Sequence, residues 1–128
     1  MRAREEEARR LLKKALKLLG RERSAIDIFF IGDAVMRRLN RVYRGKDKTT
    51  NVLSFSAPKN FPRPDLKTET AYLGEIYLNM GYIKKEGEDW RVMLIHGLLH
   101  LLGFDHEKIS DKIRMQKLEK SIASSLEF

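Results

Sequence analysis

All three histidines of this 128-residue chain lie within one short segment, HGLLHLLGFDH, as His96, His100 and His106. On a helix, residues four apart project from the same face, so His96 and His100 can present their ring nitrogens to a single ion. Gly103 can adopt a positive φ and turn the chain, which would bring His106 back to the same ion. The spacing therefore predicts a metal site with three imidazole ligands.

Three imidazoles around a tetrahedral ion leave one coordination position for water. That open arrangement is typical of catalytic zinc, whereas a structural zinc site is closed by a fourth protein ligand. Neutral imidazole also binds nickel, copper and iron, so the histidines alone leave the metal open. The alternative is that His96 and His100 are hydrogen-bonded core residues. Burial of unpaired imidazoles would cost several kcal/mol, which favours the metal site.

The same histidine spacing, with a glycine between the second and third histidines, occurs in the metzincin proteases. Those enzymes carry a glutamate directly after the first histidine, where it acts as the general base. In this chain that position is Gly97. Peptidase chemistry of the metzincin type would therefore lack its base, and a metallopeptidase is only a weak alternative.

Hydrophobic periodicity predicts the helices that would position the histidines. The segment 89–102 is apolar on every side, which is typical of a buried central helix, and Gly103 would end it. Residues 8–19 form the apolar stripe of a first helix, with Gly20 as its C-cap. A last helix is expected to begin at Ser110 as its N-cap. The residues expected to face the core from that helix are Ile113, Leu118, Ile122 and Leu126.

Short β-branched and aromatic runs predict strands at 25–31, 51–56 and 71–78, and the first is expected to be buried on both faces, at least in its second half. A helix capped by Asp33 and ending near Gly45 separates the first two strands, which favours a parallel pair with a right-handed crossover. Its expected inward stripe is Val35, Met36, Leu39, Val42 and Tyr43. The proline-containing stretch 57–70 predicts a loop, so the second and third strands are expected to be antiparallel. A short helix is expected at 79–86.

These elements predict an α/β fold in which a small mixed sheet of three to four strands packs with about five helices. Residues 1–128 are expected to form a single domain. The chain is 42% hydrophobic and 34% charged, which excludes a disordered tail, and it has no cysteine, which excludes disulfides, thiolate catalysis and iron–sulfur clusters. No apolar run approaches the ~20 residues of a membrane span, so a cytoplasmic protein without a membrane partner is expected.

The charge balance points to an anionic partner. Lysine and arginine number 26 against 18 acidic residues, for a formal net charge of +8. RNA is the commonest partner of a small basic domain. One segment combines Asp47 with the basic residues Arg37, Arg38, Arg41, Arg44, Lys46 and Lys48. This segment is either a phosphate-binding stripe or a solvated helix face. The aromatic residues Tyr43, Phe55, Phe61 and Tyr72 could stack on unpaired bases or belong to the core.

Three segments, in order along the chain, resemble the YbeY family of bacterial metal-dependent endoribonucleases that act in rRNA maturation. The histidine segment resembles that family's H-G-x-L-H-L-x-G-x-D-H signature. Residues 39–55, LNRVYRGKDKTTNVLSF, are similar to its L-N-x-x-Y-R-x-K-D-x-x-T-[DN]-V-L-S-F block, and residues 73–76, LGEI, to its L-G-D-I strand. Glu75 stands where an aspartate is more usual. Relatives also tend to begin with a strand ahead of the first helix, whereas this sequence begins inside that helix.

The resemblance implies an α/β fold, a zinc ion on His96, His100 and His106, and an arginine near the metal at the position of Arg44. It further implies a single-strand-specific endoribonuclease that acts on the 3′ end of 16S rRNA and in ribosome quality control. The implied partners are therefore single-stranded RNA, rRNA and the small ribosomal subunit. The second hypothesis, from another class, is an rRNA- or ribosome-binding assembly factor whose metal is structural.

The chemistry expected of such a site follows from its residue types. Zinc can lower the pKa of bound water toward ~7 and can polarise a phosphoryl oxygen. The planar guanidinium of Arg44 suits phosphate and could stabilise charge in the transition state. Asp105 and Asp47 are candidates for orienting an imidazole N–H, with a plain turn residue as the alternative for each.

Overall fold

The computed structural model describes residues 2–104 and 109–128, which form five helices and three strands. Within that part of the chain, no helix is both long and apolar enough to cross a membrane. In chain order the elements are α1 (Arg2–Leu18), β1 (Ser24–Phe30), α2 (Asp33–Arg44), β2 (Val52–Ser56), β3 (Ala71–Leu78), α3 (Met80–Lys85), α4 (Trp90–Leu101) and α5 (Ile109–Ser125). The predicted helices and strands are all present, most of them within a few residues of their expected limits.

The strands form one mixed sheet in the order β1-β3-β2. β3 pairs with β1 in parallel, with Phe30 opposite Leu78, and with β2 antiparallel, with Ser56 opposite Gly74. The antiparallel pair confirms the prediction, whereas the expected parallel pair of the first two strands is wrong. β3 takes the central place because its alternate residues Gly74, Ile76 and Leu78 are buried under the helices, and it uses both of its edges for pairing.

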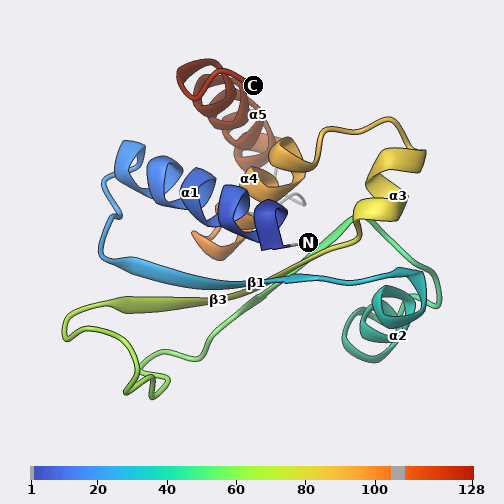
Figure 1. The fold of residues 1–128 in the computed structure, drawn as a ribbon, viewed down its shortest axis with the longest axis horizontal. Coiled ribbons are helices and arrows are strands. Elements are labelled where there is room, and N and C mark those ends of the chain that lie inside the picture. Colours follow the sequence, from blue (N-terminus) through green and yellow to red (C-terminus); the bar gives the residue numbers. More distant parts are fainter. Residues whose placement is uncertain (1, 105–108) are drawn as a thin grey trace.

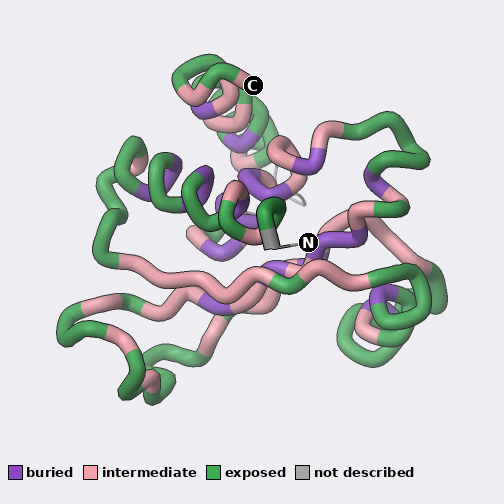
Figure 2. Tube along the Cα trace, in the orientation of Figure 1, coloured by how far each residue is buried: buried purple, intermediate pink, exposed green. Residues whose placement is uncertain are grey.

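Helices α1, α4 and α5 lie on one face of this sheet (Figure 1). The core between them is centred on α4, which contacts β2, β3, α1 and α5. Figure 2 shows the buried residues concentrated along this layer. Leu94, Ile95, Leu98 and Leu99 are each at most 1% exposed. The expected buried central helix is thereby confirmed. Apolar residues surround α4 because the sheet covers one side of it and other helices cover the rest.

α4 approaches the sheet most closely at Gly97. A Cβ atom placed there would lie 3.1 Å from a methyl carbon of Ile76 and 3.4 Å from one of Val52. The helix begins at Asp89, whose side chain caps the backbone N–H of Arg91. After the helix, Gly103 adopts a φ of 102° and turns the chain, as its position in the sequence predicts.

Two predicted helix caps differ in the structure. Gly32 is the N-cap of α2, and Asp33 is its first helical residue. The Asp33 carboxylate instead accepts hydrogen bonds from Asn79 (2.6 Å) and Thr49 (3.1 Å), which lowers the pKa of that carboxyl group. These long-range partners draw the carboxylate away from its own helix end. Ser110 lies inside α5, which already includes Ile109.

Within residues 2–104 and 109–128, the second face of the sheet has no comparable helix layer, and several predictions of burial are wrong there. Phe29 of β1 is 39% exposed, so β1 is not buried on both faces. Along α2, Met36 is fully buried, but Val35, Val42 and Tyr43 are exposed because this helix covers only one end of that face. On α5, Ile113 is 49% exposed, whereas Met115 and Ile122 are buried.

Replacement of Leu98 by alanine is expected to lower the free energy of unfolding by roughly 2–5 kcal/mol, because the fully buried side chain would leave a cavity between sheet and helices. Leu18→Ala is the matched control, since Leu18 is 54% exposed, and its effect should stay within about 0.5 kcal/mol. Urea unfolding followed by circular dichroism measures both. A loss below ~1 kcal/mol for Leu98→Ala would contradict the central position of α4.

Candidate functional site

His96 and His100 lie one turn apart on α4, with their Nε2 atoms 3.2 Å from each other. The Nδ1 atom of His96 lies 2.5 Å from a carboxylate oxygen of Glu119 on α5. The Nδ1 atom of His100 lies 3.0 Å from the backbone carbonyl oxygen of Phe104, which can only accept a hydrogen bond. Both rings are therefore held from behind through Nδ1, and their Nε2 atoms converge on one point.

This donor arrangement fits a metal ion. When both Nδ1 atoms donate and both rings are neutral, the lone pairs of the two Nε2 atoms face each other. A metal ion or a shared proton between these atoms would remove the repulsion. Two imidazole nitrogens bound to tetrahedral zinc at ~2.0–2.1 Å would be about 3.3 Å apart, close to the spacing found here. Among residues 2–104 and 109–128, no group of three metal-ligating side chains occurs. The third predicted ligand, His106, lies outside the described residues, as does Asp105.

Glu119 is a candidate site residue that was not predicted from the sequence. It lies 23 positions from His96 in the sequence, and its side chain is 18% exposed. A carboxylate behind a metal-ligating histidine fixes the tautomer and orientation of the ring and raises its basicity. A signal was available, since Glu119 is four residues after Met115 and three before Ile122, both buried. That spacing places a carboxylate on the inward face of α5.

Arg44 lies at the end of α2, next to the outer edge of the sheet. Its Nη2 atom donates to the carbonyl oxygen of Ser54 on β2 at 2.6 Å, and its guanidinium carbon lies 4.8 Å from the ring centre of Phe55. Arg44, Ser54, Phe55, Ser56 and His100 line one depression of ≈ 370 Å³. The structure thus brings Arg44 and His100 together, although they lie on different helices.

The remaining basic residues of α2 lie around a second depression, of ≈ 530 Å³, lined by Ala34, Val35, Arg37, Arg38 and Arg41. Arg37 donates two hydrogen bonds to the Asp47 carboxylate, at 2.9 and 3.1 Å, and Arg41 lies 3.8 Å from it. The bond from Arg37 lowers the pKa of the Asp47 carboxyl group. Asp47 therefore binds arginines in the described structure.

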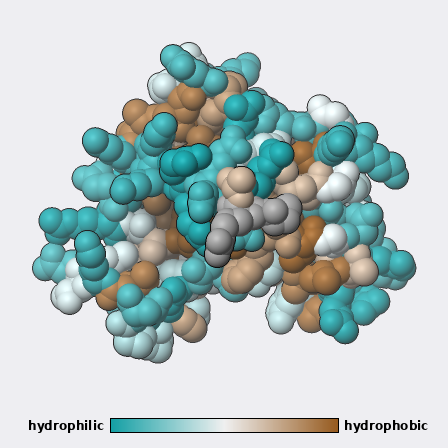
Figure 3. All heavy atoms as spheres, viewed as in Figure 1, coloured by the Kyte–Doolittle hydropathy of each residue, from teal (hydrophilic) through white to brown (hydrophobic). Residues whose placement is uncertain are grey.

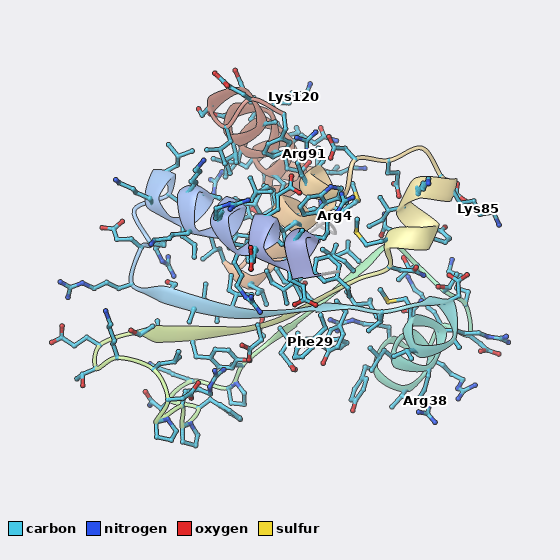
Figure 4. The ribbon with its side chains drawn as sticks, in the orientation of Figure 1. Arg4, Phe29, Arg38, Lys85, Arg91 and Lys120 are labelled. Carbon is cyan, nitrogen blue, oxygen red and sulfur yellow. The ribbon has the colours of Figure 1, made fainter. Side chains whose placement is uncertain are left out.

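Other cationic side chains extend this charged region. Arg38 projects outward from α2 (Figure 4), and Lys46 and Lys48 are exposed on the loop that follows. Figure 3 shows hydrophilic side chains over much of the visible face of the molecule. The exposed cations of α2 and its loop lie between residues 37 and 48, and Arg44, within this stretch, lines the histidine depression.

The packing of Gly97 explains why the glutamate of the metzincin proteases has no counterpart here. Gly97 is buried against Ile76 and Val52, and even a methyl group there would press on the side chain of Ile76, because it would lie 3.1 Å from the nearest methyl carbon of that side chain. A glutamate would bury an unpaired carboxylate in this core, at a cost of several kcal/mol. The helix therefore carries the histidines of a peptidase-like segment without room for the peptidase base.

An α/β fold that sets paired imidazoles beside an arginine defines the class of metal-dependent hydrolases that act on an anionic substrate. The model of the family described as Endoribonuclease YbeY matches residues 1–127. The chain belongs to this family, whose members are metal-dependent endoribonucleases, generally with zinc, of rRNA maturation. The resemblance inferred from the sequence is thereby confirmed.

Individual relatives agree with this assignment. The chain is 39% identical over 129 residues to Endoribonuclease YbeY of Anaplasma marginale, a match that covers 93% of this chain and 79% of that protein. It is 39% identical over 110 residues to the same protein of Thermodesulfovibrio yellowstonii, covering 79% and 66%. The solution structure of TM1509 from Thermotoga maritima matches with a TM-score of 0.51 and 22% identity, covering 95% of this chain and 83% of that one, which supports the fold.

Replacement of Glu119 by glutamine is expected to weaken zinc binding about 10- to 100-fold, because the amide cannot hold the His96 ring with the same charge-assisted bond. Competition with a chromophoric chelator measures the affinity, and circular dichroism checks the fold. Glu86→Gln, an exposed carboxylate after α3, is the control and should leave affinity unchanged. Equal affinities for Glu119→Gln and the wild type would show that Glu119 does not support the metal site.

Proposed function

We propose that this chain is a zinc-dependent, single-strand-specific endoribonuclease that acts in 16S rRNA 3′-end maturation and ribosome quality control. The observation that carries the proposal is the shared depression of Arg44 and His100 at the outer edge of β2. It combines a group that suits phosphate with one that suits a metal ion. Family membership supports the reaction class, an RNA substrate and a cytoplasmic enzyme family, and the small ribosomal subunit as the partner is part of this proposal.

In this proposal residues 1–128 form one hydrolase domain. Within that domain, His96, His100 and His106 hold the zinc ion. The ion, when bound, supplies Lewis acidity and a water of lowered pKa. Glu119 and the carbonyl of Phe104 orient the first two rings through Nδ1. Ring orientation set from behind in this way leaves both Nε2 atoms directed to the ion.

Arg44 binds the scissile phosphate. Its bond to the Ser54 carbonyl and its position over Phe55 hold the guanidinium beside His100. The guanidinium has five N–H donors and needs only one for Ser54, so others can donate to phosphate oxygens as negative charge develops. Because the backbone and a ring fix this group in place, little reorganisation is needed when RNA binds.

Arg44→Ala is expected to reduce RNA cleavage by ~10²-fold or more while the protein keeps its zinc and its fold. Arg44→Lys should recover only part of the activity, because an ammonium is a point charge that cannot make a bidentate contact. A single-stranded oligonucleotide with one labelled end reports cleavage, and atomic absorption reports zinc. Unchanged cleavage by Arg44→Ala would remove Arg44 from the transition state.

His100→Ala provides the complementary measurement. It should lose zinc and cleavage together, since it removes one of the three ligands proposed for the site. If the variant loses zinc and still cleaves RNA, the metal is structural. The alternative function, an rRNA-binding assembly factor, would then be favoured.

The exposed cations of α2 are expected to make RNA binding strongly dependent on salt, because each phosphate contact releases counterions. Arg38→Gln should reduce the slope of log affinity against log salt concentration by about 1, since Arg38 projects outward. Arg37→Gln should have a smaller effect, because Asp47 already neutralises part of its charge. Fluorescence anisotropy measures the slopes at salt concentrations between about 50 and 200 mM, because affinity from phosphate contacts changes strongly over that range. Equal slopes for Arg38→Gln and the wild type would exclude Arg38 from the interface.

A further inference from the structure

Aromatic rings cross the sheet on the face opposite to α1, α4 and α5. Phe29 of β1 lies on that face (Figure 4), and the strand register sets it beside Tyr77 of β3. Tyr77 is followed by Phe55 of β2 and then by Tyr43 near the end of α2. We refer to these four residues as the aromatic row.

The rings of the aromatic row contact one another in sequence. Phe29 and Tyr77 are stacked with their centres 4.9 Å apart, Tyr77 meets Phe55 edge-on at 5.7 Å, and Phe55 meets Tyr43 edge-on at 5.4 Å. Phe29 and Tyr43, at the two ends, are 39% and 63% exposed. The aromatic row therefore crosses three strands and leaves rings exposed to solvent at both of its ends, and exposed apolar surface of this kind is typical of a binding site.

The aromatic row adjoins the candidate catalytic depression near its Tyr43 end. Phe55 belongs to both, and Arg44 lies over its ring. β2 is an edge strand, so a ligand that lies along the aromatic row can pass over this edge and reach His100. The stacking surface and the proposed phosphate site are therefore continuous.

We propose that the aromatic row binds the unpaired bases of single-stranded RNA by stacking and guides the strand to Arg44 and His100. The guiding part of this inference rests on the proposed nuclease function. Exposed rings on a sheet suit bases, because every base has a π-face, whereas a duplex presents none. The preference for unpaired RNA would then have a structural cause outside the metal site.

The charges around the aromatic row favour RNA over a second protein surface. Arg44 and the cations of α2 lie at its Tyr43 end, where a backbone of phosphates would be attracted. Two carboxylates lie beside the rings, and both accept hydrogen bonds. Glu75 accepts from the Tyr77 hydroxyl at 3.1 Å, and Asp27 accepts from Tyr72 and Arg63 at 2.9 and 2.8 Å. Such carboxylates repel phosphates but accept hydrogen bonds from the amino groups of bases. They therefore favour an orientation in which the bases lie on the sheet and the phosphates lie toward α2.

The experiment compares two oligonucleotides of equal length, one of ordinary single-stranded RNA and one with abasic sites that keeps the phosphates. Tyr43→Ala and Phe29→Leu, in the full chain, should each weaken binding of the ordinary strand about 5- to 100-fold and leave binding of the abasic strand unchanged. Tyr43→Phe retains the ring and should bind as the wild type does. Phe29→Leu retains apolar bulk, so its fold is expected to survive.

Leu18→Ala is the control, since Leu18 is a comparably exposed apolar residue on α1 in the helical layer. It should bind both strands as the wild type does. Unchanged binding by Tyr43→Ala and Phe29→Leu, or an equal loss for both strands, would overturn the proposal and leave the face to another partner such as a protein. Cleavage is measured in parallel. A wild type that binds through the aromatic row without cleaving would refute the nuclease function alone, whereas cleavage with unaffected variants would refute the aromatic row alone.

Discussion

The close contact between α4 and the sheet at Gly97 is the constraint on which the site depends. Without a side chain at this position, the helix backbone settles against Ile76 of the central strand and Val52 of the edge strand. This contact fixes the rotation and height of α4 over the sheet. His96, directly before Gly97, is thereby turned toward α5, and His100, one turn later, toward the edge at Ser54 and Ser56.

The histidine pair depends equally on what lies behind it. An i, i+4 pair on a helix can point its rings in many directions, and here each ring is held through Nδ1, one by a carboxylate and the other by a backbone carbonyl. The carboxylate of Glu119 comes from α5, whose own position is set by the burial of Met115 and Ile122. Packing of the last helix is therefore coupled to the chemistry of the site, and a change in one should be felt in the other.

The two faces of the sheet have different roles. One face carries α1, α4 and α5 and holds almost all of the core. The other face carries α2 at one end, and the rest of it exposes aromatic rings and charged side chains of the strands. In a thin domain of this kind, a candidate metal centre can lie on one side of an edge strand and an extended binding surface on the other side. β2 has this position, and Arg44 bridges the two sides through its bond to the carbonyl of Ser54.

The local features of this protein follow from its amino-acid sequence alone. Apolar residues on every side identified α4 as a buried helix, the spacing of His96 and His100 predicted a shared ion, and three motif blocks identified the family and predicted a role for Arg44. Strand order, the role of Glu119 and the exposure of Tyr43 were decided by the tertiary structure. Periodicity reports which residues avoid water, but it does not report which partner covers them. A carboxylate 23 residues from its histidine, and a strand inserted between two others, depend on contacts that form only when distant segments pack together.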